Sequence, residues 1–508
     1  HPLGAGVSRP RLRWASCTMA PHRVRRPRLA SGRRSPRAAS RGFHHGLLAG
    51  TVALVAALLL QPAGSAQGAG AGNAAPALPS HGEDWPTFLG PRQDSTSAET
   101  GLRTDWGTTG PPIRWHVEMG EGYAGPAVVG DRVYVFDREG DRARLRALRV
   151  ADGREIWRSE HPTTYEDAFG YSGGARATPV VEPAAGRVFT YGADGWLRCH
   201  ATADGRLLWE RDLVRDYGIV TNFFGNGSAP LIAGDLLVVA VGGSPPGGHD
   251  IHAGAVRPNG TGLVAFDKSS GRERWRGADE LASYSSPVLR TVRGRERGVW
   301  LARDALVVFD PSNGRVDLRW PFRARKTYSV NAANPVVLGD RIFVTESYEL
   351  GGALLEVTPD LSAIEVIWRD PPRRNQALAS HWMTPVLHRG FLYGSSGEKS
   401  GDAELRSVEW ATGKVRWRKP GLTRATVLLV DGHLVVLTEY GRVLLVEATP
   451  DEYRELANVT LEAEVGGRRR PLLRHPAWNA PVLSRGVLYL RGADRLAALE
   501  LIPREAGR

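Results

Sequence analysis

One phrase recurs along this chain of 508 residues and limits what the chain can fold into. It reads LRALRVADGREIW at 145–157 and returns, with changes, as LRCHATADGRLLW, LVAFDKSSGRERW, LVVFDPSNGRVDLRW and LRSVEWATGKVRW. Each copy has an apolar stretch, then a Gly that permits a positive φ, then a second stretch ending on Trp. This is the pattern of two strands joined by a tight turn. The sequence therefore predicts a repeat protein made of strands.

The spacing of the repeats indicates the architecture. Each unit opens on a small residue, Pro and apolar residues, and these prolines lie at 126, 179, 230, 287, 335, 385 and 481. The steps are 53, 51, 57, 48, 50 and 96 residues, the last being two periods of 48. The skipped unit, Ala425–Leu456, keeps the strands but lacks Pro and Trp. Eight units with about four short strands each predict an all-β, eight-bladed β-propeller of four-stranded blades.

The two ends of the repeat region each lack what the other has. The last unit ends near Leu501 after its third strand, whereas a stray strand at Ile113–Met119 carries Trp115 without a blade of its own. Leaving the two apart would expose two sheet edges. We therefore expect the N-terminal strand to complete blade eight and close a propeller that spans 113–502.

The region before the propeller predicts export. The first 82 residues hold eleven Arg and no acidic residue, with an apolar run of fourteen residues at 47–60. That run is short for a membrane span of about 20 residues, so 1–66 is predicted to hold a secretory signal with Met19 as the expected start; an uncleaved anchor is the alternative. An Ala/Gly/Pro-rich linker is predicted for 67–83. An irregular segment packed on the propeller, with Trp85 and Phe88 as anchors, is predicted for 84–112.

Charge and cysteine content restrict the partners. The chain carries a net charge of +12, but without the eleven early Arg it has 66 − 11 = 55 basic and 54 acidic residues. The excess belongs to the signal, so no nucleic-acid partner is expected. Cys17 lies before the expected start, which leaves Cys199 and no internal disulfide. We expect a periplasmic or secreted monomer with no stable membrane span.

The repeated phrase and the Pro-Val-Val strand before it resemble the PQQ-like (pyrroloquinoline-quinone-type) repeat of eight-bladed quinoprotein dehydrogenases and BamB-like propellers. DWPTFLGP at 84–91 resembles the start of secreted bacterial PQQ-binding-like propellers. The resemblance covers 84–502. It implies that the repeated tryptophans are docking residues stacked between adjacent blades, namely Trp115, Trp157, Trp209, Trp275, Trp320, Trp368 and Trp417.

The same resemblance bears on catalysis. Quinoprotein dehydrogenases are similar to one another in an adjacent Cys–Cys disulfide, a calcium held by Glu, Asn and Asp, and an Asp base. With Cys199 alone the disulfide cannot form, and no CxxCH haem motif is present. We therefore predict no catalytic residue, no metal ligand and no firm cofactor, although PQQ with calcium stays compatible with the fold. The expected function is a non-catalytic binding scaffold; the alternatives are a PQQ-dependent oxidoreductase and a carbohydrate-binding or carbohydrate-degrading propeller.

Other polar residues carry weaker signals. His249 and His252 could share a face of a Gly/Pro-rich insertion, but no third metal ligand is evident, so we interpret them as part of a solvated loop. Asp94, Asp137 and Asp194 are interpreted as turn residues that bond the backbone.

The residues just before the repeated Pro are the best candidates for binding. Innermost strands line the axis of a propeller, so equivalent positions form rings around one mouth. Aromatic walls with a few polar groups are how proteins bind small molecules. We expect a protein or small-molecule partner there, the alternative being that these residues pack under loops. The predicted ligand-binding residues are Tyr123, Arg176, Asn226, Tyr284, Asn331, His381, Trp382 and Trp478.

Overall fold

The computed structural model describes residues 82–246, 256–326 and 329–503. The chain divides into two compact units, 1–72 and 73–508, and the first lies wholly outside the described residues. The predicted signal, 1–66, therefore also lies outside them, and the linker predicted for 67–83 is described only from residue 82. The histidines of the insertion, His249 and His252, are likewise outside the described ranges.

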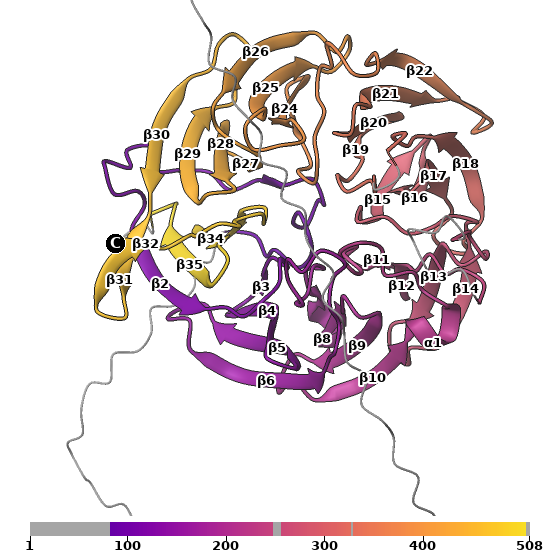
Figure 1. Cartoon of the computed structure of the whole chain (residues 1–508), viewed down its shortest axis with the longest axis horizontal. Coiled ribbons are helices and arrows are strands. Elements are labelled where there is room, and N and C mark those ends of the chain that lie inside the picture. The colour runs from indigo at the N-terminus through magenta and orange to yellow at the C-terminus, as the bar shows by residue number, and fades with distance from the viewer. Residues whose placement is uncertain (1–81, 247–255, 327–328, 504–508) are drawn as a thin grey trace, which may run out of the picture. The chain divides into compact units, whose positions relative to one another are not determined.

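Eight four-stranded antiparallel sheets stand around one axis (Figure 1), which confirms the predicted eight-bladed propeller. The strands are given from the innermost outward. Blade one is β3 (Ala127–Val129), β4 (Arg132–Glu139), β5 (Arg142–Arg149) and β6 (Glu155–Pro162), and blade two is β7 (Val180–Glu182), β8 (Arg187–Tyr191), β9 (Trp196–Ala201) and β10 (Leu207–Asp212). Blade three is β11 (Leu231–Ala233), β12 (Leu236–Ala240), β13 (Leu263–Asp267) and β14 (Glu273–Gly277), and blade four is β15 (Val288–Val292), β16 (Arg295–Leu301), β17 (Ala305–Phe309) and β18 (Val316–Pro321).

The other four blades repeat the same order. Blade five is β19 (Val336–Leu338), β20 (Arg341–Glu346), β21 (Gly351–Val357) and β22 (Ile364–Arg369), and blade six is β23 (Val386–His388), β24 (Phe391–Ser396), β25 (Glu404–Glu409) and β26 (Val415–Pro420). Blade seven is β27 (Ala425–Val430), β28 (His433–Thr438), β29 (Arg442–Glu447) and β30 (Glu455–Thr460), and blade eight is β33 (Val482–Ser484), β34 (Val487–Arg491), β35 (Arg495–Glu500) and β2 (Ile113–Glu118). Blade seven, the unit without Pro and Trp, is thus a complete sheet.

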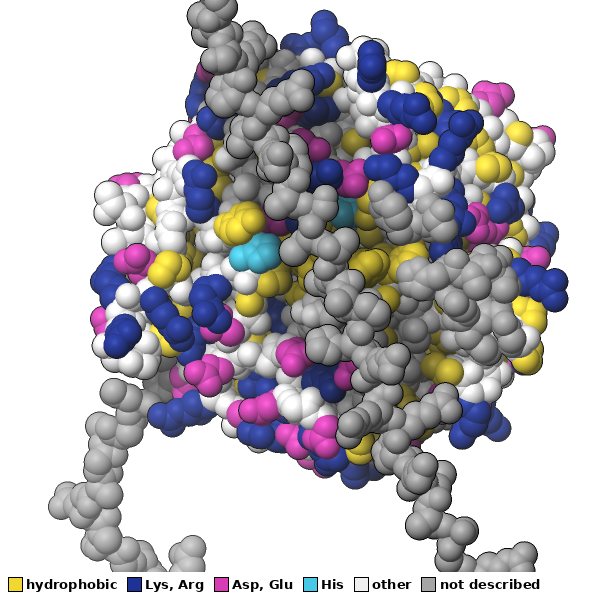
Figure 2. Space-filling model, in the orientation of Figure 1, with side chains coloured by type: hydrophobic (Ala, Val, Ile, Leu, Met, Phe, Trp, Pro, Cys, Tyr) yellow, Lys and Arg dark blue, Asp and Glu magenta, His cyan; other side chains and the backbone are white. Residues whose placement is uncertain are grey.

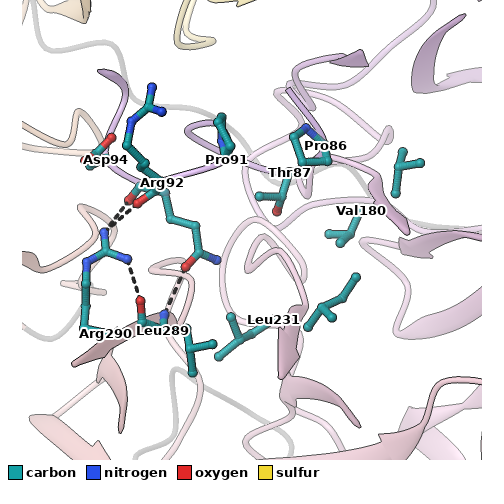
Figure 3. Close-up of a pocket in the computed structure, with 12 residues that line it drawn as sticks. Pro86, Thr87, Pro91, Arg92, Asp94, Val180, Leu231, Leu289 and Arg290 are labelled. Carbon is teal, nitrogen blue, oxygen red and sulfur yellow. Dashed lines mark hydrogen bonds between the residues drawn. The ribbon is translucent and has the colours of Figure 1, made fainter. Parts of the chain in front are cut away.

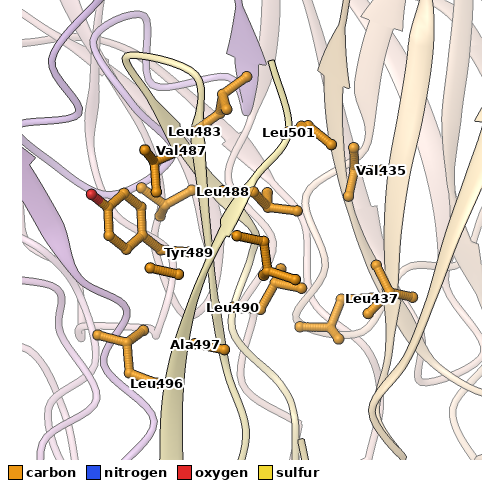
Figure 4. Packing of buried hydrophobic residues seen from close by; sticks show 14 of the residues in the cluster. Val435, Leu437, Leu483, Val487, Leu488, Tyr489, Leu490, Leu496, Ala497 and Leu501 are labelled. Carbon is orange, nitrogen blue, oxygen red and sulfur yellow. The ribbon is translucent and has the colours of Figure 1, made fainter. Parts of the chain in front are cut away.

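The last sheet shows how the ring closes. Strand β2 pairs antiparallel with β35, and Trp115 lies opposite Ala498, as the incomplete ends of the repeat region predicted. Blades seven and eight then pack face to face (Figure 4): Val435 and Leu437 of β28 share one buried cluster with Leu488 and Leu490 of β34. Because the chain ends of the ring are held in one sheet, no blade edge at the seam is left open.

The recurring Trp and Gly meet across neighbouring blades. In six cases the indole Nε1 donates to a main-chain oxygen of the next blade: Trp115 to Val150 (2.8 Å), Trp157 to Thr202 (2.9 Å), Trp209 to Lys268 (3.0 Å), Trp275 to Pro311 (3.1 Å), Trp368 to Trp410 (2.8 Å) and Trp417 to Thr449 (2.8 Å). In five of these pairs the turn Gly lies under the indole so closely that a Cβ there would fall within 3 Å of the ring. The turn therefore needs Gly both for its φ and for the approach of the Trp.

Trp320 is the exception among these tryptophans. It stacks on Phe322, with the ring centroids 5.7 Å apart and the planes 23° from parallel, and makes no such hydrogen bond within the described residues. The turn of the next blade, 358–363, has Leu361 at φ 60° where five of the other turns have Gly.

The N-terminal segment, defined here as residues 83–97, crosses the ring along the innermost strands. Trp85 exchanges two backbone hydrogen bonds with Val128 of blade one (2.7 and 2.8 Å). The oxygen of Glu83 accepts from Ser484 of blade eight (2.8 Å), and β1 (Thr96–Ser97) adds a fifth, parallel strand to blade seven. Two-residue β1 has no periodic sequence pattern, so the strand could not be predicted.

Further along, the same segment lies over a cavity of about 520 Å³ that faces blades two to four (Figure 3). Leu289 donates its backbone N–H to the Gln93 side chain (3.0 Å), and Arg290 donates to the carbonyls of Arg92 (2.8 Å) and Gln93 (3.2 Å). Val180 and Leu231 supply the apolar wall. The segment thus contacts opposite sides of the ring.

Regular structure outside the blades is scarce in the described part of the chain. It consists of α1 (Leu213–Tyr217), the 3₁₀ turn η1 (Pro183–Ala185) and the hairpin β31 (Glu462–Val465) with β32 (Arg468–Pro471). Across the ranges that the structure covers, no helix has the length and apolar character needed to cross a membrane.

Candidate binding site at the upper mouth

The loops that precede the innermost strands meet at one end of the ring, named here the upper mouth. Neighbouring loops bond directly: Tyr123 N–H donates to Ala175 (2.7 Å), and Tyr284 N–H donates to Asn331 (3.0 Å). The upper mouth is therefore one continuous surface in which each blade holds the loop of the next.

The residue before each Pro contributes to this surface. The hydroxyl of Ser286 accepts from the N–H of Ala229 (2.8 Å), the Asn334 side-chain oxygen accepts from Ser286 (2.8 Å), and Thr384 accepts from Asn334 (2.9 Å). A small polar side chain in this position satisfies a backbone donor of the previous blade. These three bonds join blades three to six through the residue before Pro.

Five rings from the upper mouth touch in sequence, and we call them the aromatic arc. Ring centroids are 5.0 Å apart from Tyr348 to His381, 5.0 Å from His381 to Trp382, 5.0 Å from Trp382 to Trp478 and 4.9 Å from Trp478 to Tyr123. Their planes are tilted by 50° or more, and each ring is half-buried. Such tilted contacts are favourable arrangements of aromatic pairs.

A second aromatic group lies on blades two to four. Phe224 contacts Tyr284 (6.0 Å), Tyr171 (5.8 Å) and Phe169 (5.4 Å), as measured between ring centroids. Phe169 is 54% and Tyr171 63% exposed, unusual values for large apolar residues. The Tyr123 hydroxyl donates to the carbonyl of Tyr171 (3.4 Å) and joins this group to the aromatic arc. Figure 2 shows hydrophobic side chains gathered around the centre of this view, among charged ones.

An ion pair at the centre of the aromatic arc holds two of its rings. The Arg424 guanidinium lies 4.4 Å from the Trp382 ring centroid and 5.8 Å from that of Trp478. Its Nη2 donates to Glu439 (2.6 Å), and the same carboxylate accepts from Trp478 Nε1 (3.3 Å). Burial pushes the pKa of Glu439 up, but the hydrogen bonds and charge of Arg424 keep this pKa below its ordinary value. Glu439 therefore stays ionised and orients both indoles.

The predicted Arg176 is anchored in a similar way. Its Nη2 donates to buried Asp167 (3.0 Å), and its guanidinium lies 5.1 Å from the Tyr123 ring. Burial raises the pKa of Asp167, but three backbone N–H donors and Arg176 lower it below the ordinary value. Arg424 and Arg176 thus each have a carboxylate partner.

His381 is neutral in this setting. Burial, followed by the positive charge of Arg424, lowers the pKa of His381 to about 3. Its Nε2 pairs with the hydroxyl of Tyr348 (2.8 Å), whereas Nδ1 has no partner within the described residues. Burial also raises the pKa of Tyr123 and Tyr284. These groups can donate or accept hydrogen bonds near pH 7 without changing charge.

Six of the eight predicted residues lie in or beside the two aromatic groups, and the side chains of the other two bond main-chain carbonyls. The Asn331 amide donates to three main-chain carbonyls of blade four, at 2.8 to 3.3 Å, and the Asn226 amide donates to Ala193 (3.2 Å). Both side chains are buried. They pin the loops of the upper mouth to the preceding blade.

Three Asp residues were interpreted as turn residues, and for Asp137 that interpretation is wrong. Strand β4 continues through Asp137, whose buried carboxylate accepts from Arg144 (2.9 Å) and Arg146 (2.7 Å). Asp137 also accepts from the N–H of Gly120 (2.7 Å), at the start of the loop that carries Tyr123. Asp94 and Asp194 do accept from backbone N–H groups two residues on.

Two carboxylates of the upper mouth escaped the sequence reasoning, namely Glu346 and Glu439. Each follows an apolar second strand and comes shortly before a Tyr, in TESY and TEYG. A Glu directly after a buried strand was the signal that could have revealed them, because ionisable residues are rarely fully buried without a role.

Fold and site together define a class, the PQQ-like repeat propellers, in which Trp and turn Gly lock adjacent blades. A family model described as outer membrane protein assembly factor BamB matches residues 108–244 and 141–419, and the chain belongs to this family. The described residues contain no group of three or more His, Cys, Asp or Glu that could hold a metal ion.

Three known proteins are similar to all or part of this chain. The structure of BamB from Moraxella catarrhalis aligns with a TM-score of 0.53 and 12% identity, covering 76% of this chain and 98% of that one. A quinohemoprotein alcohol dehydrogenase, ADHIIG from Pseudomonas putida HK5, aligns with a TM-score of 0.44 and 13% identity, covering 84% and 82%. A polyvinylalcohol dehydrogenase from Pseudomonas sp is 29% identical over 169 residues, which span 29% of this chain and a quarter (25%) of that relative.

Proposed function

We propose that the chain is an exported, non-catalytic binding protein that holds a partner at its upper mouth. The observation that carries this proposal is the aromatic arc, whose half-buried rings from blades five, six, eight and one form one surface. Aromatic and Arg side chains are the usual anchors where binding energy concentrates. Membership in a family described as an assembly factor supports a protein or small-molecule partner over a reaction.

The chemistry of the residues points the same way. A general acid or base works best with a pKa near the ambient pH. His381 stays neutral, Glu439 is tied to Arg424, and Asp167 is tied to Arg176. These groups are arranged to fix rings rather than to move protons.

PQQ, which the fold class implies, does not fit the rings as they stand. A planar cofactor needs a free aromatic face to stack on, but Arg424 lies over Trp382 at 4.4 Å. Trp382 and Trp478 contact each other at 5.0 Å with planes 54° apart, which leaves no parallel slot between them. The two indoles therefore offer PQQ no stacking site.

The test is to remove rings and measure binding and stability together. Trp382→Ala and Trp478→Ala should each weaken binding of the captured partner by about 2 kcal/mol or more, the level of an interface hot spot. Pull-down from an envelope extract with the full chain identifies that partner. Trp196→Phe, a half-buried Trp of β9 outside the aromatic arc, is the control. Unchanged binding with a large loss of thermal stability would show that the rings are packing only.

A PQQ-dependent oxidoreductase is a second candidate, favoured by the similarity to polyvinylalcohol dehydrogenase. Purified protein would be equilibrated with PQQ and calcium and then assayed for quinone absorbance and for dye reduction with polyvinyl alcohol. Turnover that Trp382→Ala abolishes would establish the enzyme and overturn the non-catalytic proposal.

A further inference from the structure

Four buried polar atoms beside the aromatic arc have no hydrogen-bond partner among the described residues. They are His381 Nδ1, Trp382 Nε1, Thr423 Oγ1 and Glu346 Oε2. An unpaired buried donor or acceptor is costly and calls for an explanation. Their clustering at blades five to seven of the upper mouth, next to half-buried rings, suggests a ligand that completes their bonds.

Contacts and sequence neighbours connect the four atoms to the aromatic arc. Tyr348 connects two of them, because its N–H donates to Glu346 (3.4 Å) and its hydroxyl pairs with His381 (2.8 Å). Thr423 directly precedes Arg424, whose guanidinium lies over Trp382. Glu346, at the end of β20, is 1% exposed and uses only its other oxygen, which accepts from the N–H of Ser347 (2.7 Å) and of Tyr348.

All four atoms can donate a hydrogen bond to a ligand, and two of them can also accept one. The Trp382 N–H can only donate, whereas the Thr423 hydroxyl and the neutral His381 ring can do either. Burial raises the pKa of Glu346 to about 8, so this carboxyl holds a proton and donates near pH 7. Hydroxyl groups can take part in both kinds of bond.

Charge pairing makes a neutral ligand the better fit beside the four atoms. Arg424 is paired with Glu439 and Arg176 with Asp167, and Lys326 donates to Glu398 at 2.8 Å. An ionic ligand that took its counter-charge from one of these residues would have to break the pair, and breaking a buried pair is costly.

We infer that the upper mouth binds a neutral polyhydroxylated ligand, an oligosaccharide or a polyol, whose apolar parts pack at the edge of the aromatic arc and whose hydroxyls bond the four atoms. The inference rests on the proposed function and names the ligand class of the same site. Because the four atoms are covered in the free protein, binding must turn the rings, and the fluorescence of the indoles must change.

The experiment uses the full chain and three kinds of probe. Neutral oligosaccharides and short polyvinyl alcohol represent the two sources of hydroxyls, and polygalacturonate is the charged comparison. Titration calorimetry and Trp fluorescence report binding. Trp382→Phe keeps a ring but removes the N–H, and should weaken binding about fivefold, the effect of one hydrogen bond. Trp382→Ala should weaken binding further, and Trp196→Phe should leave it unchanged.

Each outcome decides the matter. Binding of a neutral probe that Trp382→Phe weakens supports the inference, and the probe that binds identifies the source. Binding of polygalacturonate alone overturns it. If no neutral probe binds but Trp382→Ala still releases a captured protein partner, the inference fails and the proposed function stands. If mouth variants change no binding at all while the protein stays folded, both fail.

Discussion

At the scale of single residues, Glu346 is one source of pH dependence in the upper mouth. Its pKa in the folded protein is about 8, against an ordinary 4.5, because burial and then the nearby charge of Glu398 outweigh the hydrogen bonds that lower it. Between these two values the folded state holds a proton that the unfolded chain has released. Stability therefore falls as the pH rises through this window, by at most about 1.4 kcal/mol per pH unit from this group.

Glu346→Gln removes that titration. The difference in melting temperature between variant and wild type should grow in favour of the variant from pH 5 to pH 8. Glu121→Gln, an exposed carboxylate on the same face, should show no such trend. A Glu346→Gln protein whose relative stability is flat with pH would contradict the protonated state. The effect of His381 on stability has the opposite sign. Its pKa is lowered to about 3 in the folded protein, so this group makes the protein less stable as the pH falls below 6.5.

Residue identity in the upper mouth was only partly predictable. Tyr123, Trp382 and Trp478 could be found because the repeated Pro marks one end of every blade. Nothing in the sequence distinguishes an amide that faces a ligand from one that faces main-chain carbonyls, so the bonds of the Asn331 amide to blade four could not be foreseen. Glu439 lies fifteen positions from Arg424, and their pairing depends on the register of two strands.

At the scale of elements, the contact between Trp and turn is the repeated lock between blades. Trp209→Phe keeps a ring but loses the bond to the Lys268 carbonyl (3.0 Å). The loss should lower the free energy of unfolding by about 1 kcal/mol. Trp320→Phe is a matched control, since Trp320 makes no such bond within the described residues and should lose less. Chemical denaturation of both variants measures the difference.

Equal losses in Trp209→Phe and Trp320→Phe would show that ring size, not the hydrogen bond, stabilises the lock. Replacing Trp209 by Ala tests the ring itself and should cost roughly 3 to 5 kcal/mol. The sequence predicted these locks for all seven tryptophans. It could not show that Trp320 stacks on Phe322 of its own blade instead.

At the scale of the whole molecule, the ring depends on a strand from its far end. Deleting 113–119 removes β2 from blade eight and leaves β35 without its outer neighbour. The deletion should lower the melting temperature of the entire propeller in one transition, because the seam joins the first and last blades. Removing the hairpin 462–471, which pairs with no blade strand, is the control and should change much less. Melting of the 113–119 deletion at the wild-type temperature would contradict closure.

The N-terminal segment makes the two ends of the propeller different, because it crosses the ring. It bonds blade one at Val128, blade four at Leu289 and blade eight at Ser484, so it spans the axis. A polymer cannot be threaded through such a ring from one end to the other. Whatever binds at the upper mouth must arrive and leave on the same side. A long ligand therefore lies across that mouth and does not pass through the ring.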